Sequence, residues 1–433
     1  MEELDPNNVQ AGLVHRSRFK LFGTQRLIPL LLAFMLSACS MMQQTSIVTS
    51  TIPAQIAAPT ESSTPTTTPL TEPTPHTASS DTFDTLSLSD KEIPSQVGEL
   101  AIKFLHDTRN TGLSVAVVLR DPATGSLKAG IFNYGATSEQ NGHPITSATI
   151  YEIGSLTKLF TGILLAQAVL AGKVKLDDSI QQYLPPSIHA PIYKGIPITL
   201  VELATHRSGL PRNPSNKHGI DPFSEAYTEQ NLNAWVNGYQ LTRAPSVEYE
   251  YSNAGFALLG NILSGIARED YGELELQTIS QPLGLKDTEI VLSSEQEDRL
   301  AQGYAEPGVV APYFPQSGGM KGAGYLRSTI SDMTRFLIAN MQPDSTSLAA
   351  GLKLAQAYQV EADGIGKGMG LGWQISDAGQ GKEWLWKRGE TNGFTSYIAL
   401  ARDDRWGFAL LTNGPAIESL APDFLQLLGG LTE

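Results

Sequence analysis

Short apolar runs near both ends of the region 93–433 are typical of β-strands. The run at 112–120 is followed by a turn sequence, Asp121-Pro-Ala-Thr-Gly125, and by a second apolar run at 130–134, so this segment predicts a hairpin. Near the C-terminus, four further runs predict strands at 370–375, 384–387, 394–402 and 406–412.

Between these strands the apolar residues mostly recur at intervals of three and four, which is the spacing of amphipathic helices. Helices are predicted at 156–171, 200–205, 232–237, 255–268, 330–341 and 348–358, with a closing helix at 417–428. This order predicts an α+β fold in which one antiparallel sheet, built from both chain ends and flanked by helices, carries an inserted helical lobe. A cleft between the two parts is the expected place for a ligand.

The N-terminal segment has the features of an export signal. Four basic residues precede the ten-residue apolar run 27–36, which leads into Leu36-Ser-Ala-Cys39. The run is too short for a spanning helix, which needs about 20 residues. Its ending resembles the bacterial lipobox, in which the cysteine is acylated and becomes the first residue of the mature chain. The alternative is an ordinary signal peptide in which Cys39 has no special role.

The segment that follows has the composition of a tether. Of the 45 residues at 41–85, 25 are Ser, Thr or Pro, and none is Lys or Arg. Such a segment buries too little apolar surface to offset the loss of chain entropy on folding. We therefore predict a lipoprotein signal peptide at 1–38, a tether at 39–92 and a folded domain at 93–433. The domain would be held outside the cytoplasm by a lipid on Cys39.

Composition and charge narrow the class of protein. The 433 residues include 30 Lys and Arg against 44 Asp and Glu, which gives a formal net charge of −14 and disfavours nucleic acid as a partner. One cysteine excludes an intrachain disulfide and a cysteine-rich zinc site, and the seven histidines lack the spacing of a metal site. We expect an enzyme or binding domain that uses no metal or other cofactor.

Ser155 and Lys158 lie at the start of the most apolar predicted helix. Residues three apart project from the same face of a helical turn. A lysine buried at a helix N-terminus loses proton affinity through desolvation and the helix dipole, so its amine could accept the serine proton. The Ser-x-x-Lys pattern alone is weak, because it also occurs at Ser17–Lys20. The alternative is a helix-capping serine followed by an exposed lysine.

Two further motifs carry polar groups suited to catalysis. Tyr251-Ser-Asn253 is the only Tyr-x-Asn sequence in the chain. A phenol near lysines can ionise in part and move a proton, and an asparagine amide can hold a substrate carbonyl. Lys387-Arg388-Gly389 follows a predicted strand, but Lys-x-Gly also occurs at 128–130 and 217–219. Taken singly, these residues could equally be a packed tyrosine, a helix cap and a lysine that faces solvent.

Together and in this order, the three motifs resemble those of the serine penicillin-recognising enzymes. The chain looks most similar to the class C β-lactamase family and its relatives, the DD-peptidases and small-ester hydrolases. The resemblance covers most of residues 95–430, and residues 174–211 are most similar to the AmpH-type D-alanyl-D-alanine carboxypeptidases/endopeptidases. The segments that carry it beyond the motifs are Glu152–Thr161, Gly172–Asp178, Ile198–Pro211 and Gly322–Thr329. The resemblance implies the serine β-lactamase/DD-peptidase fold.

The resemblance also implies a role for each motif residue. Ser155 is the expected nucleophile, with Lys158 as its base partner. Tyr251 is expected to relay a proton to the leaving group, and Asn253 to position Lys158 and the substrate. Lys387 is expected to supply positive charge toward Tyr251 and toward a substrate carboxylate.

Three neighbouring positions are also assigned by the resemblance, and two of them depart from the family pattern. The backbone N–H group of Glu390 is expected to complete an oxyanion hole with that of Ser155, and its side chain stands where glycine or serine is usual. This extra carboxylate could weaken β-lactam binding. Arg388 replaces a small residue or threonine, and it either binds a substrate carboxylate or points to solvent. Asn213 lies where the family often has a glutamine that contacts the acyl side chain.

We therefore expect an acyl-serine hydrolase that cleaves D-Ala-D-Ala-type peptidoglycan peptides, binds or hydrolyses β-lactams, or does both. Only 13 residues separate Trp373 from Lys387, fewer than in class C β-lactamases, which favours a peptidase-like or esterase-like member. The alternatives are an esterase or D-amino-acid amidase that uses the same residues, and an inactive module that senses wall fragments. A Ser-His-Asp triad is disfavoured, because Ser155 lacks a Gly-x-Ser-x-Gly context and His206 lies in a motif that looks structural.

Overall fold

The computed structural model describes residues 92–215, 219–362, 366–379 and 381–430. The predicted signal peptide, Cys39 and all of the predicted tether except its last residue lie outside these ranges. Lipidation and tethering therefore stay predictions. Within the described ranges, no helix has both the length and the apolar character needed to cross a membrane.

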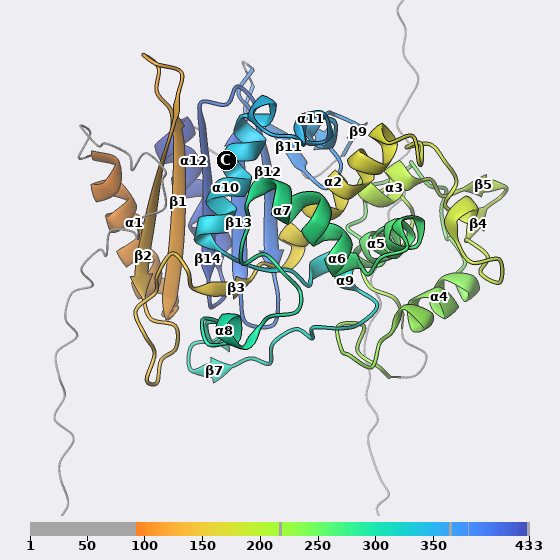
Figure 1. The fold of residues 1–433 in the computed structure, drawn as a ribbon, viewed down its shortest axis with the longest axis horizontal. Coiled ribbons are helices and arrows are strands. Elements are labelled where there is room, and N and C mark those ends of the chain that lie inside the picture. The colour runs from red at the N-terminus through yellow and green to blue at the C-terminus, as the bar shows by residue number, and fades with distance from the viewer. Residues whose placement is uncertain (1–91, 216–218, 363–365, 380, 431–433) are drawn as a thin grey trace, which may run out of the picture. The chain divides into compact units, whose positions relative to one another are not determined.

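Both ends of the folded domain contribute strands to one antiparallel sheet. Figure 1 shows the orange strands of the early chain beside the blue strands of the late chain. This arrangement confirms the predicted α+β fold, with its sheet built from both chain ends. In spatial order the strands are β2 (Leu127–Gly135), β1 (Gly112–Arg120), β14 (Trp406–Thr412), β13 (Thr395–Ala401), β12 (Glu383–Glu390), β11 (Gln374–Asp377), β10 (Gly368–Met369) and β9 (Val360–Glu361).

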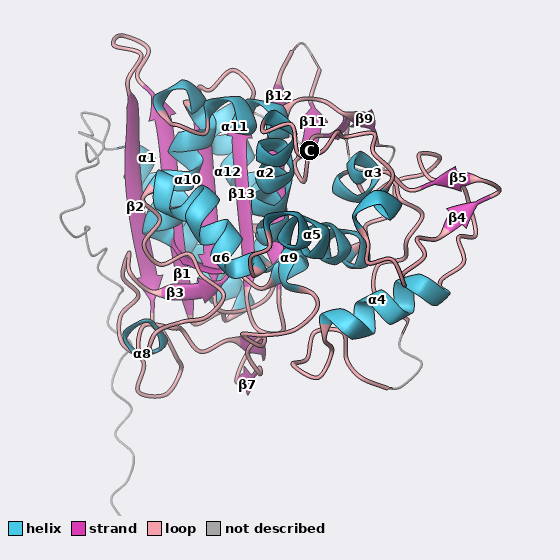
Figure 2. Cartoon of the chain, turned by 45° about the vertical axis from the view of Figure 1, so that its right-hand side comes forward, coloured by secondary structure: helices cyan, strands magenta, loops and turns pink. Residues whose placement is uncertain are grey.

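Helices cover both faces of this sheet, and two apolar layers result. Along β1, Val115 and Val117 face one layer, whereas Ala116 and Val118 face the other. Because successive side chains of a strand alternate between faces, a sheet covered on both sides produces the unbroken apolar runs seen in the sequence. One face packs on α1 (Glu92–Thr108) and α12 (Ala421–Gly429), and the other on α2 (Thr157–Leu170), α10 (Ile330–Met341) and α11 (Ala349–Gln356) (Figure 2).

The helical lobe is formed by the middle of the chain, as the sequence predicts. Its main helices are α3 (Leu200–Ala204), α4 (Glu229–Gly238) and α5 (Asn253–Ala267). The shorter helices of the whole domain, in the lobe and outside it, are η1 (Gly154–Leu156), η2 (Ile180–Tyr183), α6 (Tyr271–Glu275), η3 (Leu276–Ser280), α7 (Gln281–Leu283), α8 (Ser294–Glu297), α9 (Lys321–Gly324), η4 (Pro343–Ser345) and η5 (Ile417–Ser419). The described residues also form three small two-stranded sheets. These pair β3 (Ile150–Glu152) with β8 (Arg327–Thr329), β4 (Ile192–Tyr193) with β5 (Ile196–Pro197), and β6 (Tyr304–Glu306) with β7 (Val309–Val310).

The strand predicted at 370–375 is wrong in part, because the chain turns within it. Residues 370–373 join β10 to β11 as a tight hairpin, in which the N–H of Gly370 donates to the carbonyl of Trp373 at 2.9 Å. Gly372 has a φ of 84°, and a Cβ there would lie 2.5 Å from the carbonyl oxygen of Lys158. The glycine therefore serves both the turn and its close approach to α2.

Helix α1 was not among the predicted helices. Its buried residues Val97, Ala101 and Phe104 are spaced four and three apart and face the sheet. This spacing is a helical signal that the chain carries at the very start of the folded domain.

Candidate active site

Ser155 lies on η1, between β3 and α2. The chain turns at Gly154, whose φ is 51°, and a Cβ there would lie 2.6 Å from both the amide nitrogen and the carbonyl oxygen of Glu390. A Cβ on Gly389 would clash with the carbonyl oxygen of Ile153. Only glycine fits at either position. The two glycines thus allow the backbone next to Ser155 to pack directly against the end of β12.

Lys158 is completely buried, and its Nζ lies 3.0 Å from Oγ of Ser155. The same amine donates to Oδ1 of Asn253 at 2.8 Å and to the carbonyl oxygen of Ala323 at 2.5 Å. Burial, together with two nearby cationic side chains, holds the pKa of Lys158 well below its ordinary value. A neutral amine has two N–H bonds and one lone pair. With both N–H bonds donated to carbonyl groups, the lone pair is left for the hydroxyl of Ser155.

Tyr251 donates a hydrogen bond from its phenol to Oγ of Ser155 at 2.6 Å. Burial raises the pKa of Tyr251 to about 12, although the hydrogen bond to Ser155 and nearby arginines oppose this effect. The expectation of a partly ionised phenol is therefore wrong at neutral pH. Three basic side chains lie close to the centroid of the tyrosine ring, with Nζ of Lys158 at 4.9 Å, Nζ of Lys387 at 5.0 Å and Cζ of Arg212 at 4.9 Å.

Lys387 and Arg388 point in different directions from β12, as neighbours on a strand do. Lys387 is completely buried, and its Nζ has no hydrogen-bond partner in the described part of the chain. Burial lowers its pKa to about 7. Arg388 is partly exposed and forms ion pairs with Glu390 at 2.7 Å and with Glu418 at 2.9 Å. The structure thus places Lys387 against Tyr251, whereas carboxylates of the same chain neutralise Arg388.

Asn253 is the first residue of α5, and its side chain bridges two parts of the site. Oδ1 accepts from Lys158, while Nδ2 donates to Oδ1 of Asn213 at 2.8 Å. The backbone N–H of Asn253 donates to the carbonyl of Arg212 at 2.7 Å, so residues 212 and 213 are fixed at the start of α5. Arg212 was not among the predicted site residues. Its signal is a cationic residue directly before the predicted Asn213.

A cleft of about 510 Å³ contains most of these groups. Side chains of the sheet and of the helical lobe both line it, as expected from the sequence. Lys387 is not among the described residues that line the cleft. The lining residues are Ser155, Arg212, Asn213, Phe223, Tyr249, Tyr251, Asn253, Phe314, Ala323, Gly324, Gln374, Trp386, Arg388, Glu390, Thr391 and Asn392. Within the described ranges, both in this cleft and outside it, no three His, Cys, Asp or Glu side chains lie close enough together to hold a metal ion.

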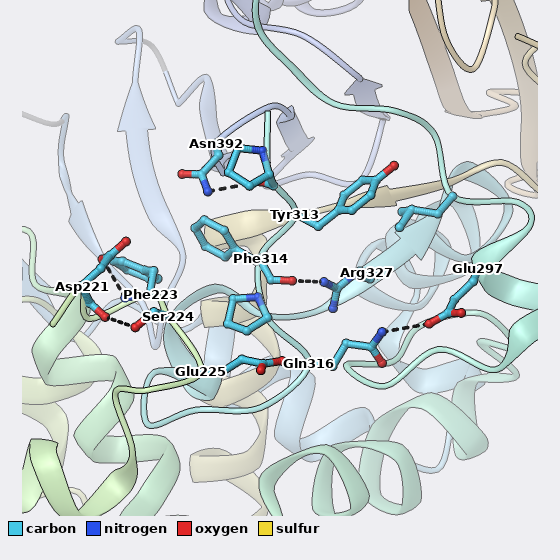
Figure 3. A pocket seen from close by; sticks show the side chains of 13 residues that line it. Asp221, Phe223, Ser224, Glu225, Glu297, Tyr313, Phe314, Gln316, Arg327 and Asn392 are labelled. Carbon is cyan, nitrogen blue, oxygen red and sulfur yellow. Dashed lines mark hydrogen bonds between the residues drawn. The ribbon is translucent and has the colours of Figure 1, made fainter. Parts of the chain in front are cut away.

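A second cavity, of about 650 Å³, adjoins this cleft. The two share Phe223, Phe314 and Asn392 as lining residues, and Figure 3 shows these side chains around the second cavity. Arg327 holds its wall in place. The buried guanidinium of Arg327 pairs with Glu152 at 3.1 Å and donates to the carbonyl of Phe314. The wall that separates the two hollows is therefore anchored from within the protein.

Comparison with known proteins agrees with this architecture. A family model described as Beta-lactamase matches residues 99–428. The chain belongs to the β-lactamase family. This β-lactamase-family protein is 30% identical over 296 residues to the D-alanyl-D-alanine-carboxypeptidase/endopeptidase AmpH of Escherichia coli K12. The matched region covers 65% of this chain and 76% of that protein. It is 27% identical over 370 residues to a Beta-lactamase of the same strain, which covers 76% and 92% of the two chains.

Solved structures share the fold of this β-lactamase-family protein. A Beta-lactamase/D-alanine Carboxypeptidase from Yersinia pestis, complexed with citrate, matches 78% of this chain and 97% of its own with a TM-score of 0.70 and 24% identity. A class C β-lactamase mutant matches 80% and 99% with a TM-score of 0.68 and 23% identity. The predicted fold and the resemblance to class C and AmpH-type proteins are confirmed. The protein is a serine hydrolase of this family.

Proposed function

We propose that this serine hydrolase cleaves D-Ala-D-Ala-type peptidoglycan peptides through an acyl-enzyme formed on Ser155, and that β-lactams acylate the same residue. The environment of Lys158 is the observation that carries the proposal. Its amine is buried, its pKa lies well below the ordinary value, and both N–H bonds of its neutral form are used by Asn253 and Ala323. The remaining lone pair gives Ser155 a base at hydrogen-bond distance.

In acylation, Oγ of Ser155 attacks the carbonyl carbon while the hydroxyl proton passes to Nζ of Lys158. The negative charge on the former carbonyl oxygen falls near the backbone N–H groups of Ser155 and Glu390, where each donor is worth about 3–4 kcal/mol in comparable sites. The C–N bond then breaks as the phenol of Tyr251 gives its proton to the leaving amine. The proton held by Lys158 restores the phenol, and water hydrolyses the ester by the reverse transfers.

Recognition of a substrate carboxylate in this proposal rests on Arg212 rather than on Arg388. The charge of Arg388 is balanced by Glu390 and Glu418, and Lys387 does not line the cleft. Arg212 lines the cleft beside Tyr251, and no carboxylate in the described ranges pairs with it. A charge-assisted hydrogen bond from Arg212 would contribute about 1.5–3 kcal/mol.

The cavity beside the cleft supports a peptide-sized acyl group. Phe223, Tyr313 and Phe314 give it apolar walls, and its volume of about 650 Å³ exceeds what a single D-alanine needs. A location outside the cytoplasm, on a lipid attached to Cys39, belongs to the same proposal. Its support is the signal and tether composition of residues 1–92, which would hold the domain where peptidoglycan lies.

An esterase or amidase on the same residues is the second candidate. Glu390 favours it, because its half-exposed carboxylate lines the cleft and repels an anionic substrate. Ser155, Lys158 and Tyr251 serve either reaction, so the two candidates differ only in the substrates that bind.

The test compares a D-Ala-D-Ala peptide with a neutral p-nitrophenyl ester. Arg212→Gln should lower kcat/KM for the peptide by about 10- to 150-fold and affect the ester distinctly less. Arg388→Gln is the matched control, with a smaller effect expected because its charge is already paired. Lys387→Ala should slow both substrates by similar factors, since it acts through Tyr251. Wild-type activity confined to the ester would contradict the peptidase and favour the esterase.

Intact mass after incubation with penicillin separates the β-lactam outcomes. A lasting adduct on Ser155 indicates a penicillin-binding peptidase, because the acyl-enzyme is then slow to hydrolyse. Rapid turnover of penicillin indicates a β-lactamase. Absence of both adduct and turnover contradicts the β-lactam part of the proposal.

A further inference from the structure

His206 is a buried histidine that the steps above do not use. It follows α3 closely and is completely buried. Its φ of 59° lies in the left-handed region, which non-glycine residues adopt rarely and usually where the surrounding structure holds them.

His206 contacts three consecutive residues around the phenol that donates to Ser155. Its carbonyl oxygen accepts from the N–H of Glu250 at 2.8 Å, and its Nδ1 accepts from the N–H of Ser252 at 3.0 Å. Its ring lies 4.4 Å from the ring of Tyr251, with the two planes inclined by 31°. His206 thus holds the tyrosine ring and the residues on both sides of Tyr251, through its own ring and its backbone carbonyl.

The surroundings of His206 favour a neutral ring. An imidazole whose Nδ1 accepts a hydrogen bond carries its proton on Nε2. Burial and the nearby charges of Lys387, Lys158 and Arg212 lower the pKa of His206 well below its ordinary value. Besides Tyr251, the titratable side chain of Tyr249 also faces it, at 5.7 Å and edge-on. A second proton would place a positive charge beside these three basic side chains and would remove the acceptor that Ser252 uses.

We propose that His206 is a positioning residue for Tyr251. Its neutral imidazole, by accepting from the backbone of Ser252, fixes the tyrosine so that the phenol points at Oγ of Ser155 and can protonate a leaving group. The inference rests on the proton-relay role proposed for Tyr251, but it does not depend on whether peptides or esters are the preferred substrates.

Two variants separate the contributions of the acceptor and the ring. His206→Asn keeps an acceptor atom in the place of Nδ1 and tolerates the left-handed backbone, but it loses the ring. His206→Phe keeps an aromatic ring and loses the acceptor. Acylation is measured with aryl esters of one acyl group, ordered from p-nitrophenol to phenol as the leaving group. The poorer leaving groups need a proton from Tyr251, whereas p-nitrophenolate leaves without one.

His206→Phe should slow the phenyl ester by about tenfold or more and the p-nitrophenyl ester by less than about threefold, since a misplaced general acid matters only for the poorer leaving group. His206→Asn should restore the wild-type dependence on the leaving group. Equal slowing of all esters in His206→Phe would indicate a merely structural role and overturn the inference. Failure of His206→Asn to restore the dependence would overturn the role of the acceptor.

Tyr251→Phe in the same ester series separates this inference from the one on which it rests. If Tyr251→Phe leaves the dependence on the leaving group unchanged, the proton-relay role of Tyr251 is wrong, and the inference falls with it. If Tyr251→Phe steepens the dependence and His206→Phe does not, only the inference about His206 is wrong. Rates are divided by the amount of Ser155 that a fluorophosphonate labels, so misfolded protein does not contribute.

Discussion

Replacing Lys387 with methionine should stabilise the protein at neutral pH. The lysine is completely buried, and its Nζ has no hydrogen-bond partner in the described part of the chain. Its pKa is lowered to about 7, which means that the folded protein holds the proton of Lys387 far less tightly than an unfolded chain does. Methionine has a similar length and enough flexibility to fill the same space without a charge.

The size of the effect follows from the two pKa values. A lysine in an unfolded chain has a pKa of about 10.4. Between pH 7 and about pH 10.4 the unfolded chain binds more protons at this site, so the wild-type free energy of unfolding rises with pH in this window. At about 1.36 kcal/mol per pH unit, the penalty from Lys387 is about 4 kcal/mol at pH 7 and falls to about 1 kcal/mol at pH 9.5. Below about pH 7 both states hold the proton, and the penalty no longer changes.

Urea unfolding of the wild type and of Lys387→Met at pH 7 and pH 9.5 measures this directly. The variant should be more stable by about 4 kcal/mol at the lower pH and by about 1 kcal/mol at the higher. Lys158 is present in both proteins, but the charge of Lys387 helps to lower its pKa, so relief of that repulsion in the variant adds to the stabilisation at the lower pH. Lys103→Met on the exposed face of α1 is the control and should leave stability nearly unchanged at either pH. Parallel pH dependence of wild type and Lys387→Met would refute the lowered pKa.

Three further predictions address the nucleophile, the anchor and the backbone of the site. Ser155→Ala should abolish labelling by penicillin or a fluorophosphonate at an unchanged thermal midpoint, and persistent labelling would place the nucleophile elsewhere. Cys39→Ser should move the protein from the membrane fraction to the soluble fraction, because a diacylated cysteine is the strong anchor that the sequence predicts, whereas retention would point to an uncleaved signal or a partner. Gly389→Ala should cost about 1–3 kcal/mol in urea unfolding, since its Cβ would clash with the carbonyl of Ile153. Gly265→Ala on α5, where a Cβ meets no atom within 4 Å, should instead gain about 0.5–1 kcal/mol, and a similar loss at both glycines would contradict the steric argument.

Local sequence patterns predicted most of the fold because each element carries its own signal. The helix expected at 330–341 has those bounds in α10, and the runs that became β13 and β14 are buried along their whole length. Where a pattern was ambiguous, tertiary contacts decided the outcome. The glycines at 370 and 372 fit a strand as well as a turn by spacing alone, and the turn forms because Gly372 packs on the backbone of Lys158.

Ion pairs between residues far apart in the chain could not be predicted from the sequence. Arg388 was expected either to bind a substrate carboxylate or to point to solvent. Neither expectation included Glu418, which lies thirty residues later in the chain and pairs with Arg388 at 2.9 Å. No spacing rule predicts contact between a strand residue and a short helix that follows two further strands along the chain. Consequently the charge of Arg388 could be counted from the sequence, but its balance by Glu390 and Glu418 could not.

Protonation states in the site depend on burial in a way that the motifs do not express. The sequence places lysines near Tyr251, and cations near a phenol ordinarily favour its ionised form. In the structure the same burial that raises the pKa of Tyr251 to about 12 lowers that of Lys387 to about 7 and holds that of Lys158 well below its ordinary value. Burial thus weakens the positive charge that would otherwise stabilise a phenolate. Burial therefore favours the neutral forms of the base Lys158 and of the acid Tyr251 on either side of the Ser155 proton transfer, so that charge develops as the substrate reacts.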